Sequence, residues 1–333
     1  MNILFDIIHP ADVNFFKASI FRLQETDNNV FVSYRDRGKL FSILSYELSN
    51  IRLIKLGMHQ KTVWCKVWAQ ILRDFAMFSV VKSLDIDVVA CFGSVSVIGA
   101  RLAGAKFVAF DDDYEYKLAF YHPNLLANKH VYPDFIPLRN SRVKVYHGYK
   151  ELAYLHPDVF KISNIILPKN RYCFIRVIGH ASINYADEMQ TDWVALYRLL
   201  EKLSIVPYVS IEMKEEERLF RNIGYNVLKE PVEEFYSFLS NAQFVITLGD
   251  TIAREASLLA VPTLYYGTRE MVVNREITDI GIMKKVTTWG CLMEEVEKFN
   301  IDSYETAILE VRRRYASWSS TTEVILDSIF EVS

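Results

Sequence analysis

Short, continuous apolar runs alternate along this chain with longer segments whose apolar residues recur every three or four positions. The first pattern is typical of strands buried on both faces, and the second of helices that pack by one side. Repeated strand–helix units predict a parallel sheet covered on both faces. In the first half, we expect strands at 3–8, 30–34, 51–55, 87–91 and 106–110, and helices at 13–24, 39–48, 63–84 and 95–102.

The regular alternation stops between residues 121 and 160, where Pro123, Pro133, Pro137 and Pro157 interrupt short apolar pieces. Proline and polar punctuation of this kind is typical of connections between domains. We therefore predict a first domain over residues 1–155 and a second over residues 156–333.

A second alternating series follows this connection. Its expected strands are 172–178, 206–211, 225–228, 244–248 and 263–266, with helices at 193–203, 232–240 and after 249 and a helical end at 304–330. The predicted fold class is α/β, with two doubly wound Rossmann-like domains that face a central cleft. We also expect the terminal helices to pack back on the first domain.

Composition limits the classes of function. The 333 residues suffice for two hydrophobic cores, and 51% hydrophobic with 24% charged residues indicates a globular protein. A net charge of −3 gives no support for a nucleic-acid partner. Four scattered cysteines, no apolar run long enough to span a bilayer and a first strand at the start of the chain predict a cytoplasmic protein without a signal peptide. Contact with the inner face of a membrane would be peripheral.

The most informative loop follows the expected strand 244–248. Gly249, Asp250 and Thr251 turn the chain into a helix, with Asp250 or Thr251 as the predicted N-cap. Free backbone N–H groups and the helix dipole make such a turn an anion site, and Glu255 lies one turn further on, within reach of a sugar hydroxyl. The pattern favours a nucleotide or nucleotide sugar, and an ordinary crossover with nothing bound is the alternative.

Polar residues also follow the expected strands of the first half. His9 and Asp12 stand at the start of the first helix, where either could accept a proton from a sugar hydroxyl. Asp12 should remain ionised at the helix N-terminus. The alternative is that Asp12 only caps the helix. The glycine turn at 93–94 is expected to be structural.

An acidic run, Asp111-Asp112-Asp113, follows the strand 106–110. Clustered carboxylates at a strand end are costly unless they are solvated, paired or bound to a cation or sugar, so a solvated loop is the alternative. Asp111 and Asp113 are candidate catalytic residues. No spacing typical of a metal site accompanies them.

The loop after strand 172–178 contains Gly179, His180 and Ser182. The glycine allows a close backbone approach, and the two polar side chains could donate to a diphosphate. A purely structural histidine is the alternative at His180.

Several of these segments together resemble the DUF354 family, an uncharacterised prokaryotic group related to GT-B nucleotide-sugar enzymes. The opening segment 3–17 with its His-Pro-Ala, the Phe110-Asp-Asp-Asp113 segment, Gly148–Pro157 and Gly249–Glu255 carry the resemblance. It implies a nucleotide in the second domain, with Glu255 near the ribose and the 249–251 turn near the diphosphate. Asp12 and Asn14 depart from the pattern, because the family usually has histidine at both positions.

The resemblance favours a glycosyltransferase that moves a sugar from a nucleoside-diphosphate sugar to a surface-glycan precursor, free or lipid-linked. Asp12 or His9 would be the base, and neither a metal nor a cofactor is expected because backbone amides can stabilise the departing diphosphate. A UDP-N-acetylglucosamine 2-epimerase-like enzyme is one alternative, although the Arg-Arg-Glu-Asn and His-Gly-Asp segments of that group are absent. A non-catalytic nucleotide-sugar-binding or scaffold subunit is the other.

The expected helix 63–84 carries an unusual number of large apolar residues. Trp64, Val67, Trp68, Ile71, Leu72, Phe75 and Phe78 form its stripe. Packing against the sheet and contact with a membrane or a lipid acceptor both explain such a stripe, and we favour packing.

Overall fold

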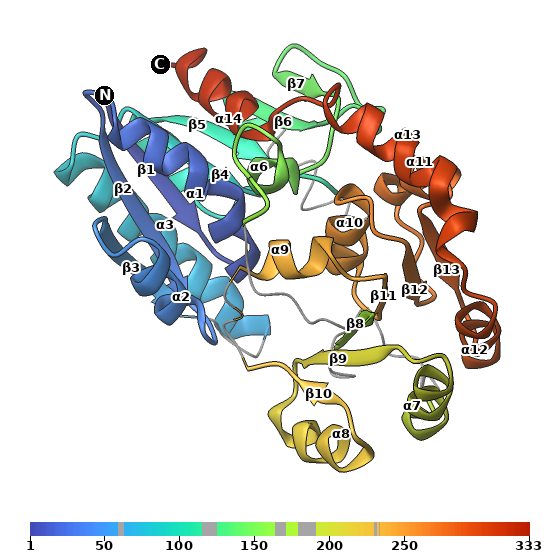
Figure 1. The fold of residues 1–333 in the computed structure, drawn as a ribbon. Coiled ribbons are helices and arrows are strands. Elements are labelled where there is room, and N and C mark those ends of the chain that lie inside the picture. Colours follow the sequence, from blue (N-terminus) through green and yellow to red (C-terminus); the bar gives the residue numbers. More distant parts are fainter. Residues whose placement is uncertain (59–62, 115–124, 164–170, 179–190, 230–231, 233) are drawn as a thin grey trace. The chain divides into compact units, whose positions relative to one another are not determined.

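The computed structural model describes residues 1–58, 63–114, 125–163, 171–178, 191–229, 232 and 234–333. The chain forms two compact units, one of residues 1–159 with 318–333 and the other of residues 160–317. Figure 1 shows that each unit has its own sheet and helices.

The first unit contains a seven-stranded sheet in the order β3-β2-β1-β4-β5-β6-β7, and every neighbouring pair is parallel. Its strands are β1 (Asn2–Ile7), β2 (Asn29–Asp36), β3 (Arg52–Met58), β4 (Val88–Phe92), β5 (Lys106–Phe110), β6 (Lys129–Pro133) and β7 (Val143–Tyr146). Its helices are α1 (Pro10–Gln24), α2 (Leu40–Glu47), α3 (Val63–Ser83), α4 (Val97–Leu102), α6 (Leu152–Leu155) and α14 (Thr321–Phe330).

The second unit contains a six-stranded parallel sheet in the order β10-β9-β8-β11-β12-β13. Its strands are β8 (Tyr172–Val177), β9 (Val206–Ile211), β10 (Asn226–Val227), β11 (Phe244–Thr247), β12 (Thr263–Tyr266) and β13 (Met283–Val286). Its α-helices are α7 (Trp193–Lys202), α8 (Glu217–Ile223), α9 (Phe235–Ser240), α10 (Asp250–Leu258), α11 (Arg275–Asp279), α12 (Trp289–Glu297) and α13 (Glu305–Tyr315). Three short 3-10 helices lie at Lys214–Glu216, Val272–Asn274 and Ile301–Tyr304.

The predicted α/β class with two parallel sheets is confirmed, but the prediction missed several elements. Strands β6 and β7 and helix α6 lie inside the segment 121–160 that we expected to be irregular. They were missed because they are short and lie among the prolines of this segment. The predicted helical end 304–330 is two helices, α13 and α14, separated at 316–320. Strand β13 and helices α8, α11 and α12 were not predicted.

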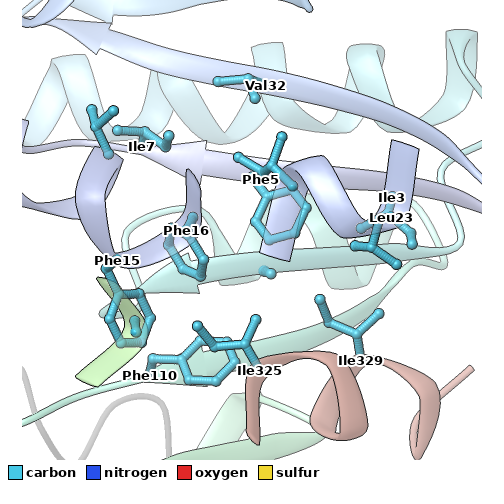
Figure 2. Close-up of a cluster of buried hydrophobic side chains, with 14 of the residues drawn as sticks. Ile3, Phe5, Ile7, Phe15, Phe16, Leu23, Val32, Phe110, Ile325 and Ile329 are labelled. Atoms are coloured by element: carbon cyan, nitrogen blue, oxygen red, sulfur yellow. The ribbon is translucent and has the colours of Figure 1, made fainter. Parts of the chain in front are cut away.

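One face of the first sheet carries the larger core of its unit. Phe5 from β1, Phe16 from α1 and Phe110 from β5 pack with Ile325 and Ile329 of α14 (Figure 2). The rings of Phe16 and Phe110 meet edge to face, with centroids 5.7 Å apart. The last helix of the chain is therefore part of the first core.

Helices α3 and α4 cover the opposite face of this sheet. Met77 and Val81 of α3 pack there with Val89 of β4 and Phe107 of β5. The same face of α3 also buries a charge, because the guanidinium of Arg73 binds the carboxylate of Asp6 at 2.5 Å. Both side chains are almost completely buried.

Asp6 is the centre of a buried polar network. Its carboxylate accepts hydrogen bonds from Ser33 of β2, at 2.7 Å, and from Ser96 just before α4. Arg73 also donates to the backbone carbonyl of Leu56 in β3. The network thus joins three adjacent strands to two helices.

We predict that Arg73→Met destabilises the first unit by about 3–5 kcal/mol, because it leaves the Asp6 carboxylate buried without its charge partner. The shift of the urea unfolding midpoint measures this effect. Lys55→Met is the control, since it removes the exposed Lys55–Asp36 pair of the same sheet and should leave the midpoint nearly unchanged. Equal shifts for the two variants would contradict the prediction.

Candidate functional site

The strand order places the candidate crevice of each sheet. In the first sheet β1 lies between β2 and β4, and in the second β8 lies between β9 and β11. Successive connections run in opposite directions from these central strands, and ligands of doubly wound folds bind outside the carboxyl ends of the strands at such points. The loops after β1 and β4, and those after β8 and β11, are therefore the candidate sites.

The loop after β1 ends in a capping box at the start of α1. His9 is the N-cap, and its Nδ1 accepts the backbone N–H of Ala11 at 3.2 Å. Asp12 is the third helical residue, and its Oδ2 accepts the N–H groups of Ile8 and His9 at 3.2 and 2.9 Å. The capping role that we considered for Asp12 therefore exists, shared with His9.

Asp12 is nevertheless unlike an ordinary capping residue, because it is buried. Burial raises its pKa to about 7, although the two backbone hydrogen bonds and Lys150 act in the opposite direction. This departs from our expectation that Asp12 would remain ionised at the helix terminus, because the cost of burying the charge outweighs these interactions. The carboxyl group therefore takes up a proton at a higher pH than an exposed aspartate does.

The acidic run after β5 is paired as well as clustered. Asp111 meets His130 of β6 at 2.7 Å, and burial raises the pKa of Asp111 to about 6. Asp112 meets Lys150 at 2.7 Å, and Asp113 is half-buried beside them. The solvated-loop alternative therefore fails for Asp111 and Asp112.

The buried thiol of Cys91 in β4 shows that these groups share one region. Burial raises its pKa well above the usual value, and the charges of Asp6, Asp12 and Asp111 raise it further. The carboxyl edge of the first sheet thus gathers carboxylates from β1 and β5. Across the described residues, no group of histidine, cysteine and acidic side chains could hold a metal ion.

Two cationic residues of this edge were not predicted. Lys150 binds Asp112 and lies over the ring of Phe92 at 5.3 Å from its centroid. Arg35, at the end of β2, is half-buried, and its pKa is lowered by burial and by the neighbouring Arg73 and Arg37. Lys150 belongs to the Gly148–Pro157 segment, which carried the resemblance but gave no indication of a cation beside Asp112.

In the second unit, α10 begins one residue earlier than predicted. Gly249 is the N-cap, in an extended conformation, and Asp250 is already helical. The Thr247 hydroxyl accepts the Gly249 N–H and donates to the Gly249 carbonyl, both at 3.0 Å, which fixes the turn. The prediction of Asp250 or Thr251 as N-cap was wrong.

Charged side chains also lie at this turn. Asp250 binds Arg269 at 3.1 Å, and Thr251 is half-buried beside it. Arg269 also lines a cavity of about 300 Å³ with Asn274, Arg275 and Lys285. A helix start with adjacent basic groups suits an anionic ligand.

Glu255, the candidate contact for a sugar hydroxyl, is a buried side chain. It is only 3% exposed, because residues 253–258 of α10 are all buried. The Tyr236 hydroxyl donates to its Oε1 at 3.0 Å. The predicted residues Gly179, His180 and Ser182 lie outside the described part of the chain.

Comparisons with solved structures define the class of this fold. A candidate UDP-N-acetylglucosamine 2-epimerase from Listeria monocytogenes superposes with a TM-score of 0.76 at 15% identity, over 98% of this chain and 95% of the other. The UDP-GlcNAc 2-epimerase of Neisseria meningitidis, bound to UDP-GlcNAc, gives 0.66 at 15% identity over 99% and 100%. The glycosyltransferase VinC, in complex with dTDP, gives 0.66 at 11% identity over 100% and 99%. The chain therefore has the fold of GT-B nucleotide-sugar enzymes.

A match to a family model assigns the chain to a narrower group than the fold does. Residues 112–332 match the model of the family described as protein of unknown function DUF354, and the chain belongs to this family. The resemblance deduced from the motifs is thus confirmed. No curated protein matches the sequence.

The raised pKa of Asp12 has a consequence for stability. The pKa of about 7 in the folded protein lies above the ordinary aspartate value of 3.8, so the contribution of this carboxyl to stability is complete below about pH 4 and is lost as the pH rises to about 7. We predict that Asp12→Asn, which keeps an oxygen acceptor for the cap, gains stability relative to the native chain over this range. The relative gain should be on the order of 4 kcal/mol.

Urea unfolding of both proteins at several pH values between 4 and 8 measures this difference. Asp111 titrates in both proteins, so its effect cancels. A difference that stays constant with pH would contradict the assignment of a buried, neutral Asp12.

Proposed function

We propose that the protein is a glycosyltransferase that uses a nucleoside-diphosphate sugar and Asp12 as its general base. The observation that carries the proposal is the buried carboxyl at the central crevice of the first sheet, with a pKa of about 7. A general base works best when its pKa lies near the working pH, and an ordinary aspartate is too weak a base.

The reaction would be a direct displacement. The acceptor hydroxyl oxygen forms a bond to the anomeric carbon of the donor, its proton passes to the Asp12 carboxylate, and the bond to the nucleoside diphosphate breaks. The first unit would bind the acceptor. Lys150 lowers the pKa of Asp12 and so favours its reactive, ionised form.

The nucleotide would bind at the carboxyl edge of the second sheet. Backbone N–H groups at Asp250 and Thr251 would face the diphosphate, because the Gly249 N–H is already bound by Thr247. Arg269 would supply a cation beside them. The Asp250 carboxylate already pairs with Arg269, so it would compete with the diphosphate for this guanidinium. Solved structures with the same fold bind UDP-GlcNAc and dTDP, which supports this choice of ligand class. Gly179, His180 and Ser182 remain candidate diphosphate contacts.

Glu255 is the proposed acceptor for a ribose hydroxyl. Because it is buried, this role requires Tyr236 to share the carboxylate or to move aside. We predict that Glu255→Ala weakens binding of a nucleoside diphosphate about 10- to 150-fold, which corresponds to the loss of about 1.5–3 kcal/mol for a hydrogen bond to a charged group.

Isothermal titration calorimetry with UDP, GDP, CDP and dTDP measures this change. Tyr236→Phe is the matched control, since it removes the tyrosine hydroxyl and keeps the carboxylate, and it should bind at least as tightly as the native protein. If Glu255→Ala binds as tightly as the native chain, Glu255 does not contact the nucleotide.

Asp12→Asn tests the base directly. We predict that turnover falls about 10²- to 10⁴-fold, the usual contribution of a positioned general base, while nucleotide affinity stays unchanged. His9→Ala is the control within the same capping box, and we expect it to retain most of the activity because His9 is exposed and Asp12 keeps its backbone partners. Full turnover in both variants would indicate that Asp111 or Asp113 is the base instead.

The assay also separates the two alternatives. The protein is incubated with a panel of nucleoside-diphosphate sugars and glycan acceptors, and the products are followed by mass spectrometry and NMR. Sugar transfer supports the proposal, a change of configuration at C2 indicates an epimerase, and binding without turnover indicates a scaffold subunit. The epimerase deserves the direct test because solved epimerases share the fold.

A further inference from the structure

Five of the seven large apolar side chains in the predicted stripe on α3 are exposed, while the side chains of Trp64 and Val67 lie outside the described part of the chain. Trp68 is 65% exposed, Leu72 66% and Phe75 69%, and Ile71 and Phe78 are also exposed. Our preference for core packing of these residues was wrong. The side of α3 that does pack carries Arg73, Met77 and Val81.

Helix α4 extends the exposed surface, because it packs alongside α3. Ile98 and Leu102 point to solvent, and Leu102 is 74% exposed. We call the seven exposed side chains the α3–α4 patch. It consists of Trp68, Ile71, Leu72, Phe75, Phe78, Ile98 and Leu102.

The patch is large for a surface that meets only water. An aromatic side chain carries roughly 150–250 Å². Trp68 and Phe75, at their exposed fractions, therefore contribute roughly 200–300 Å², and five further exposed large side chains lie on the same two helices. The largest apolar patch of a typical monomer covers about 300–600 Å², and larger ones mark sites of interaction.

The charged residues near the patch indicate which kind of surface it binds. The exposed charged residues of the described parts of α3 and α4 are Lys82 and Arg101, both cations. The one carboxylate there, Asp74, is half-buried and accepts hydrogen bonds from Gly99 N–H and Gln70. Apolar aromatic side chains bordered by cations are the pattern of helices that lie in the interface of an anionic bilayer.

We propose that the α3–α4 patch binds the surface of a membrane that contains anionic lipids. The apolar side chains enter the boundary between headgroups and acyl chains, and Lys82 and Arg101 contact lipid phosphates. Trp68 is suited to this boundary because its ring is apolar while its N–H can reach a polar partner. Within the described residues no helix is long and apolar enough to cross a bilayer, so the contact is peripheral.

This proposal does not depend on glycosyl transfer, because it concerns a surface outside the two candidate crevices. The proposal also accounts for the orientation of α3. The buried Arg73–Asp6 pair fixes which side of the helix faces the sheet, and the aromatic side is left for another partner.

Sedimentation with vesicles tests the proposal. The native chain should bind vesicles of phosphatidylglycerol and phosphatidylcholine more tightly than phosphatidylcholine alone, and added salt should weaken the binding. The double variant Trp68→Glu, Phe75→Glu should bind at least tenfold more weakly while it keeps its circular dichroism spectrum. Tyr46→Glu is the matched control, since Tyr46 is an exposed aromatic residue of α2, and it should bind like the native chain.

Lys82→Glu combined with Arg101→Glu should weaken binding to the anionic vesicles at least fivefold per charge and leave binding to neutral vesicles unchanged. Quenching of tryptophan fluorescence by brominated lipids gives a readout on the native chain, which does not depend on how a variant folds. Quenching that persists in Trp68→Phe would contradict a role for this residue.

Three results would overturn the proposal. They are a native chain that stays in the supernatant with anionic vesicles, a Trp68→Glu, Phe75→Glu variant that still binds them, and a native dimer that this variant converts to a monomer. The last result, measured by light scattering, would assign the patch to contact between two copies of the chain.

Discussion

The buried ion pair between Asp6 and Arg73 is the constraint on which the first unit depends. Asp6 lies on the central strand β1, and its hydroxyl and guanidinium partners come from β2, α3 and the start of α4. Such pairs contribute little net stability, because desolvation offsets the attraction between the charges, but an unpaired partner is costly. The pair therefore acts mainly on geometry. It fixes the rotation of α3, so that Met77 and Val81 face the sheet while Trp68 and Leu72 face outward.

The carboxyl edge of the same sheet holds several charged side chains whose burial costs stability. Burial raises the pKa values of Asp12 and Asp111, so each carboxylate is destabilised in its ionised form. His130 and Lys150 offset part of this cost, because His130 binds Asp111 and the charge of Lys150 lowers the pKa of Asp12. Perturbed acids at the crevice of a doubly wound sheet are more typical of a reactive site than of a structural one.

The sequence predicts those features that depend on neighbours along the chain. Most strands and helices, the parallel sheets and the family followed from apolar periodicity and local motifs. The direction in which α3 faces did not, because the helix is apolar on several sides and its orientation is decided by Arg73 with Asp6, 67 positions away. His130 and Lys150 were missed for the same reason, since pairing of β6 with β5 brings His130 to the acidic run, and the segment Gly148–Pro157 brings Lys150 there. The burial of Glu255 was missed because α10 is covered on most of its sides.

The position of Lys150, the cation at the crevice of the first sheet, depends on the C-terminal end of the chain. Lys150 belongs to the segment Gly148–Pro157, which is tied to α14 by hydrogen bonds from the hydroxyls of Thr321 and Thr322 to the carbonyls of Tyr149 and Ala153, both at 2.7 Å. The ring of Tyr149 also meets Trp318 edge to face. A close approach of the chain at Gly148 completes the contact, because a Cβ atom there would lie 3.4 Å from the Ser319 carbonyl oxygen. The segment that best identified the family is thus the one that positions Lys150 beside Asp112, and it does so only because the chain returns to its first unit.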